Sequence, residues 1–169
     1  MTLSMYQASV PVFLRAFDNL STILDKGAAF AAAKKIEPSV LINARLAPDM
    51  FALARQIQIA SDTVKGCVAR LAGIEIPSFT DTETTFAELK ERLAKTAAFI
   101  KTVTAAQIDG TEGKPITMKV GPTRELSFTG QSYLLTFVLP NLFFHITATY
   151  AILRHNGVEI GKSDYLGAV

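Results

Sequence analysis

A row of polar side chains lies within an otherwise apolar stretch near the C-terminus. Asn141, His145 and Thr149 are spaced by four residues inside the run 133–153, which carries no formal charge. In an α-helix, side chains four apart lie one above the other on the same face. A buried polar group left without a partner costs about 1–3 kcal/mol. The spacing therefore predicts a polar element that faces this row.

A pair with the same spacing offers the partner. Gln58 and Asp62 are four residues apart and flank the apolar seam of another predicted helix. We expect Gln58, Asp62, Asn141 and His145 to form one polar cluster at mid-height of a helical bundle, with Thr149 completing a ligand-binding set. The candidate catalytic residues are His145 as a general base and Asp62 as the group that orients it. The alternative is a hydrogen-bonded core histidine that holds the helices in register.

Composition limits the classes of protein that this chain fits. Its 169 residues suit a single domain, 1–169, and 49% hydrophobic with 19% charged residues excludes general disorder. A formal net charge of +2 gives no sign of a nucleic-acid partner. The lone cysteine, Cys67, falls in a helical pattern and is expected to be a buried structural thiol. No secretory signal is visible, so the expected location is cytoplasmic.

The elements that must position the cluster follow from hydrophobic periodicity and from helix-terminating residues. Apolar steps of three and four predict helices, and alternation around Gly121 predicts a β-hairpin over 115–128 that lies on the bundle. Gly27 is expected to stop the first helix, and Thr80 with Glu83 has the spacing of a capping box. The expected helices span residues 4–25, 48–73, 80–110 and 131–156, followed by a packed tail over 158–169. The fold class is all-α, a four-helix bundle.

The uncharged run 133–153 is long enough to span a bilayer. Pro140, Asn141 and His145 stand at its centre, where polar groups in lipid are costly. The three other helices each have one apolar stripe and need a shared partner. The run is therefore predicted to be the central core helix of the bundle, with no membrane as partner.

Two stretches resemble a known superfamily. His145–Gly157, HITATYAILRHNG, is similar to the last helix of DinB/YfiT-like proteins, in which the second histidine of an HxxxH pair precedes a Leu-Arg and then a glycine. With 69–73 (ARLAG), LAPDMFALARQIQIA and GVEIGKSDYLG, nearly the whole chain resembles an uncharacterised bacterial branch of that superfamily. The resemblance implies a four-helix bundle, often a homodimer, with a divalent metal held by three histidines in many members. Some members resemble thiol-dependent transferases.

The superfamily's metal ligands are mostly missing from this chain. His145 matches the second histidine, but Asn141 stands at the first position, and the second-helix position falls near Gln58 on a helix without histidine. A zinc or nickel site needs about three strong donors. We therefore expect no cofactor, and a small-molecule-binding or regulatory bundle that has lost the three-histidine site. The alternatives are an enzyme of the thiol transferase or hydrolase type, dependent on His145 or on zinc or nickel bound there, and a purely structural oligomer.

Overall fold

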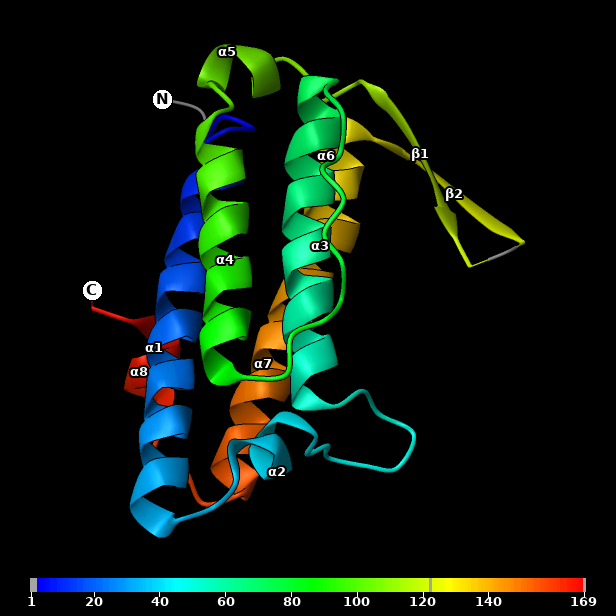
Figure 1. The fold of residues 1–169 in the computed structure, drawn as a ribbon. Coiled ribbons are helices and arrows are strands. Elements are labelled where there is room, and N and C mark those ends of the chain that lie inside the picture. The colour runs from blue at the N-terminus through cyan, green and yellow to red at the C-terminus, as the bar shows by residue number, and fades with distance from the viewer. Residues whose placement is uncertain (1–2, 122, 169) are drawn as a thin grey trace.

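The computed structural model describes residues 3–121 and 123–168. Four long helical segments run side by side around one apolar core (Figure 1). The first and last descend in this view, and the second and third ascend, joined by residues 74–85, which return along the bundle. The long segments are α1 (Val10–Lys34), α3 (Leu53–Ala72), α4 (Phe86–Lys101) and the run of α6 (Gly130–Ser132), η1 (Tyr133–Val138) and α7 (Leu139–His155). The predicted four-helix bundle is confirmed.

Short elements close the ends and sides of the bundle. Two single-turn helices follow α1 and α4, and a third follows α7 and packs on α1. The two strands form an antiparallel hairpin in which Ile116 pairs with Phe128. These elements are α2 (Pro38–Ile42), α5 (Ala105–Ile108), α8 (Lys162–Leu166), β1 (Pro115–Val120) and β2 (Arg124–Thr129).

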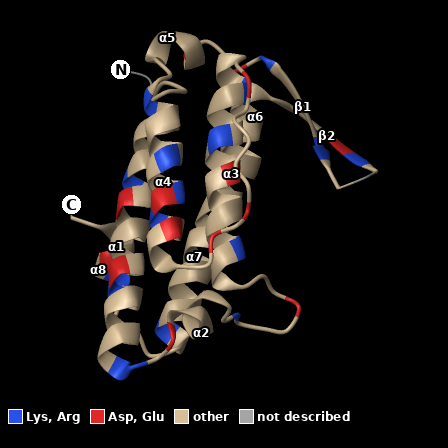
Figure 2. Ribbon diagram, in the orientation of Figure 1, with Lys and Arg blue, Asp and Glu red and all other residues tan. Residues whose placement is uncertain are grey.

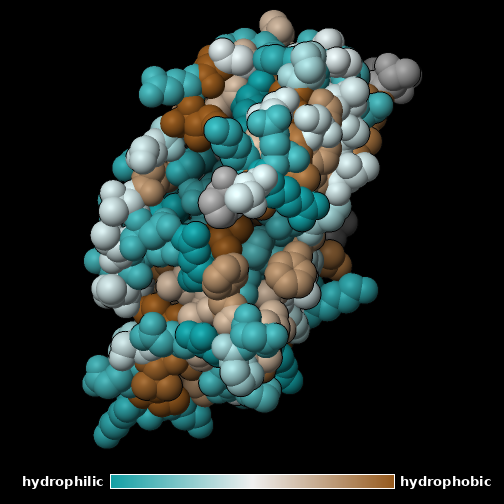
Figure 3. Space-filling model, turned by 90° about the vertical axis from the view of Figure 1, so that its right-hand side faces the viewer, coloured by the Kyte–Doolittle hydropathy of each residue, from teal (hydrophilic) through white to brown (hydrophobic). Residues whose placement is uncertain are grey.

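The last long helix is one corner of the bundle, so its prediction as a central spine was wrong. α7 packs mainly on α3 and only lightly on α1, whereas α4 packs on both α1 and α3. The outer face of this last segment leaves Leu135 of η1 and Phe143 and Phe144 of α7 exposed. Figure 3 looks onto the side that carries the hairpin, where hydrophobic side chains reach the surface between hydrophilic ones. The homodimer expected from the family resemblance stays a prediction.

Among the described residues, Gly130–His155 is the helix long and apolar enough to cross a membrane, and 39% of its most apolar window is buried. Length and composition alone are weak evidence, because core helices of globular domains meet the same criteria. Its inner face is fully built into the core, with Leu142, Ile152 and Leu153 excluded from solvent.

Several predicted helix limits were displaced. α1 continues through Gly27, because the rings and methyls of Phe86 and Leu153 pack against the bare Cα of that glycine, and it ends at Lys35 with a φ of 53°. The expected capping box at Thr80 and Glu83 does not form. The observed box uses Thr85 and Glu88, so α4 begins at Phe86.

The start and end of two other segments also differ from the predictions. α3 begins at Leu53 rather than Pro48, and α4 ends at Lys101 rather than Gly110. The last helix ends as expected before Gly157, whose φ is 94°. Before α7, residues 133–138 form a π-helical turn that the periodicity did not predict. This turn lies directly before Pro140, which lacks a backbone donor and would clash with the carbonyl four residues earlier in a regular α-helix.

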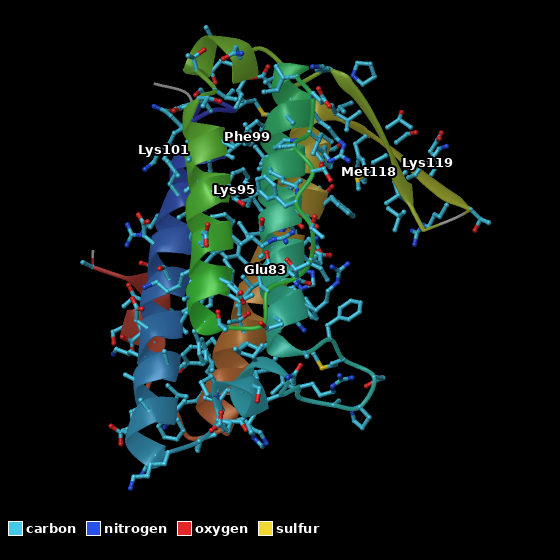
Figure 4. The ribbon with its side chains drawn as sticks, viewed as in Figure 1. Glu83, Lys95, Phe99, Lys101, Met118 and Lys119 are labelled. Carbon is cyan, nitrogen blue, oxygen red and sulfur yellow. The ribbon has the colours of Figure 1, made fainter. Side chains whose placement is uncertain are left out.

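The hairpin was predicted at the right residues but does not lie flat on the bundle. Its strands project from the end of the bundle where α3 ends and α6 begins (Figure 1). Ile116 is its buried anchor, and Phe128 packs against Tyr133 and Phe137 at ring-centroid distances of 5.6 and 5.4 Å. Lys119, labelled in Figure 4, stands on the projecting part, away from the bundle.

Candidate functional site

His145 is held between α7 and α3 by a chain of hydrogen bonds. Its side chain is buried, and its Nδ1 lies 2.7 Å from Oε1 of Gln56. The Nε2 group of Gln56 donates to the carbonyl of Phe51 at 3.0 Å. Because a carbonyl only accepts, the Gln56 amide must turn its oxygen toward His145, and Nδ1 must carry the proton. The neutral imidazole therefore keeps its lone pair on Nε2.

Burial, followed by the positive charge of Arg55, lowers the pKa of His145 below its ordinary value of 6.5. As the pH falls, the His145 imidazole of the unfolded chain is therefore protonated near pH 6.5, whereas that of the folded chain is protonated only at a lower pH. It follows that the contribution of His145 to folding weakens as the pH falls from that value toward the lower folded pKa.

We predict that His145→Asn flattens this pH dependence. The asparagine amide can replace the Nδ1 donor to Gln56 but does not titrate between pH 7 and 5. In urea unfolding at these two pH values, the wild type should lose more stability on acidification than the variant. His155 is present in both proteins, so the difference between their losses of stability comes from position 145. Equal losses would contradict a depressed folded pKa at His145.

The other two members of the polar row are also bonded within the protein. Nδ2 of Asn141 donates to Oγ1 of Thr63 at 2.9 Å, and Oγ1 of Thr149 donates to the carbonyl of His145 at 2.9 Å. Asn141 and His145 therefore contact α3, whereas the Thr149 hydroxyl is bonded within α7.

Gln58 and Asp62 lie on a different side of α3, so the structure does not bring the four predicted residues together. Nε2 of Gln58 donates to Glu83 at 2.9 Å, and Asp62 lies 2.9 Å from Arg92 and 2.7 Å from Lys65. Asp62 is thus engaged by cations and does not orient His145.

The partner that the sequence did not predict is Gln56. Residues two apart on a helix point about 160° away from each other, so Gln56 faces α7 while Gln58 faces the segment 74–85. The rotation of α3 about its own axis therefore decides whether Gln56 or Gln58 contacts His145.

A buried arginine organises the α3–α4 side. The Arg92 side chain is 1% exposed and makes ion pairs of 2.9 Å with Asp62, Asp81 and Glu83. Figure 4 shows Glu83 between α3 and α4, on the segment that joins them. The ammonium groups of Lys65 and Lys95 lie 4.2 and 4.5 Å from the ring centroid of Phe79, which is on the same segment. These cation–π contacts and the ion pairs of Arg92 hold residues 74–85 against the bundle.

Figure 2 shows that this side carries both signs of charge. Burial raises the pKa of Glu83, but the hydrogen bonds from Arg92 and Gln58 lower it by more than burial raises it. The pKa of Glu83 therefore lies below its ordinary value. Glu83 is therefore an ionised partner of Arg92, and this contact holds residues 74–85 against α4.

The described residues hold no group of three or more His, Cys, Asp or Glu side chains arranged to share a metal ion. Cys67 is buried as expected, and burial strongly raises the pKa of its thiol. A thiol that stays protonated is a poor nucleophile and a poor metal ligand.

A cleft of about 270 Å³ lies between α1, α7 and α8, and none of the predicted site residues lines it. Two polar side chains of α1 border it. Arg15 Nη2 donates to the carbonyls of Leu166 and Ala168, each at 3.0 Å, and Asn19 Nδ2 donates to the carbonyl of Tyr165 at 3.1 Å. The rest of its lining is apolar or aromatic: Val12, Ala16, Phe143, Ile146, Tyr165 and Leu166. The sequence predicted a packed tail over 158–169, but not the cleft that this tail helps to enclose.

Comparison with known proteins places the fold in a family. Residues 5–166 match the family described as "Domain of unknown function (DUF1993)". The chain is 43% identical to a protein of known crystal structure described as a DinB family member from Shewanella denitrificans, with a TM-score of 0.88 over 97% of this chain and 92% of that one. No protein with curated annotation matches it. The chain therefore belongs to the DUF1993 family of DinB-like four-helix bundles.

Proposed function

We propose that this chain is a metal-independent bundle that binds a small molecule in the cleft between α1, α7 and α8. The observation that carries the proposal is the lining of that cleft, with six apolar or aromatic residues and two polar ones, Arg15 and Asn19. Small-molecule sites are concave and mostly apolar, with a few polar groups that fix orientation. The volume of about 270 Å³ suits a ligand at the small end of that class.

The residues around His145 suit a metal poorly. The imidazole is a single strong donor, and its neighbours Gln56 and Asn141 contribute amides already bonded to His145 and to Thr63. Neutral amides are weak ligands for zinc or nickel. The polar row is therefore best understood as a contact that sets the register of α3 against α7.

A cleft-filling substitution tests the proposal. In Val12→Phe the added ring enters the cleft, and affinity for a neutral hydrophobic dye such as Nile red should fall at least about tenfold. His145→Asn serves as the control and should bind the dye like the wild type. Incubation with a chelator should leave both the binding and the melting temperature unchanged.

Two results would count against this function. Equal dye affinity in the wild type and in a folded Val12→Phe variant would place binding elsewhere. A melting temperature that falls on chelation and recovers with zinc or nickel would restore the metal-dependent alternative.

One observation favours the second candidate, an enzyme of the thiol transferase or hydrolase type. The hydrogen bond to Gln56 leaves Nε2 of His145 as a free base, and its lowered pKa keeps the ring neutral. Gln56, not Asp62, would then be the orienting residue. A turnover that is lost in His145→Asn but kept in Val12→Phe would transfer the function to this site.

A further inference from the structure

We propose that the cleft takes an amphipathic monocarboxylate, with its carboxylate on Arg15 and its apolar chain along Val12, Phe143 and Ile146. This inference rests on the proposed function and adds the chemical class of the ligand. It follows from the charge of the lining, from the acceptors that Arg15 already holds, and from the way the C-terminal segment closes over α1.

Among the described residues that line the cleft, Arg15 is the one with a charged side chain. A guanidinium presents several donors in a planar fork that matches a carboxylate, and such charge-assisted bonds are about twice as strong as neutral ones. The amide of Asn19 lies one turn further along α1 and supplies another donor at the same border. The guanidinium of Arg15 and the amide of Asn19 together make this border of the cleft positively charged and rich in hydrogen-bond donors.

The opposite part of the cleft suits a hydrocarbon chain. Phe143 and Ile146 come from α7, and Val12 and Ala16 come from α1. These side chains offer no hydrogen bond to a ligand, so a strongly hydrated molecule would lose its water without replacement. A polar head with an apolar chain meets both halves of the lining.

The C-terminal segment shows what kind of acceptor Arg15 holds. Its Nη2 donates to two backbone carbonyls, those of Leu166 and Ala168. Backbone carbonyls are neutral acceptors, and an ionised carboxylate at the same position would bind a guanidinium more strongly. A carboxylate ligand would therefore displace the end of the chain from Arg15.

The segment has other anchors that stay when Arg15 changes partner. Lys26 pairs with Asp164 at 2.6 Å, and the hydroxyls of Thr147 and Tyr165 lie 3.0 Å apart. Gly167 lets the chain turn directly over Asn19, since its φ is 71° and a Cβ there would come within 2.2 Å of the Asn19 side chain. The segment can thus release Arg15 without leaving the bundle.

Calorimetric titration with three ligands that share one alkyl chain tests the proposal: octanoate, octan-1-ol and octylammonium. The wild type should bind octanoate most tightly and octylammonium least. Arg15→Gln should weaken octanoate binding by about tenfold or more, with little effect on octan-1-ol. Lys26→Gln loosens the same segment without touching the cleft, and should bind octanoate at least as tightly as the wild type.

The outcomes separate this inference from the function beneath it. Octan-1-ol binding as tightly as octanoate, or an unchanged octanoate affinity in Arg15→Gln, would overturn the carboxylate class and leave a small-molecule cleft intact. Equal weakening in Lys26→Gln and Arg15→Gln would assign the effect to the C-terminal segment and overturn the role of Arg15. If neither octanoate nor Nile red binds, the proposed function itself fails.

Discussion

Replacing Arg92 by methionine should lower the free energy of unfolding by about 3 kcal/mol or more. The substitution keeps most of the side-chain length but removes the cation that Asp62, Asp81 and Glu83 share. Glu83 is the most enclosed of the three, with 11% of its side chain exposed, and its largely buried charge would be left with neutral partners such as Gln58. Urea unfolding followed by circular dichroism measures the loss.

Two further readouts identify the cause of that loss. The pKa of Glu83 should rise in Arg92→Met, because burial raises it and the opposing hydrogen bond from Arg92 is gone. Lys90→Met removes an ion pair with Asp25 that lies at the surface, and should change stability by less than about 1 kcal/mol. Losses of similar size in the two variants would show that the Arg92 network is no stronger than an ordinary surface pair.

The second large effect is expected at Gly130, where the last helical segment begins. A Cβ at this position would lie 2.0 Å from the carbonyl oxygen of Thr111, a backbone atom that side-chain rotation cannot move away. The backbone of Gln131 also donates to the carbonyl of Glu112, which ties the two segments together. Gly130→Ala should therefore destabilise the fold by about 3 kcal/mol, at the upper end for overpacking.

Gly113→Ala is the matched control, because a Cβ at Gly113 meets no atom within 4 Å. Its effect should stay within about 0.5 kcal/mol. Thermal unfolding of both variants provides the comparison. A Gly130→Ala protein as stable as Gly113→Ala would mean that the close approach of Thr111 is not a constraint.

Much of the fold could be predicted from local patterns, since each helix needed an apolar stripe and the hairpin needed alternation. Helix limits failed where a tertiary contact overruled the local signal. Gly27 reads as a stop in sequence, but Phe86 and Leu153 fill the space beside it and keep α1 helical. Thr80 and Glu83 have capping-box spacing, yet Glu83 forms an ion pair with the buried Arg92, and Thr85 is the N-cap of α4.

The candidate site was harder to predict for a geometric reason. Periodicity indicates that His145 is buried, but which residue faces it depends on the rotation of α3, and this selects Gln56 over Gln58. The cleft could not be predicted, because it forms where α8 packs on α1 and where Tyr165 of α8 reaches Thr147 of α7. In sequence, Arg15 and Asn19 belong to the polar side of an amphipathic helix and carry no sign of a ligand.

The central claim is that the ligand lies under α8 and not beside His145. Methyl and ring-proton NMR spectra recorded during an octanoate titration test it directly, because both places carry assignable protons. The account predicts saturable shifts for the methyl groups of Val12 and Ile146, with the ring protons of His145 unmoved. Shifts that centre on His145 and leave Val12 unchanged would contradict it.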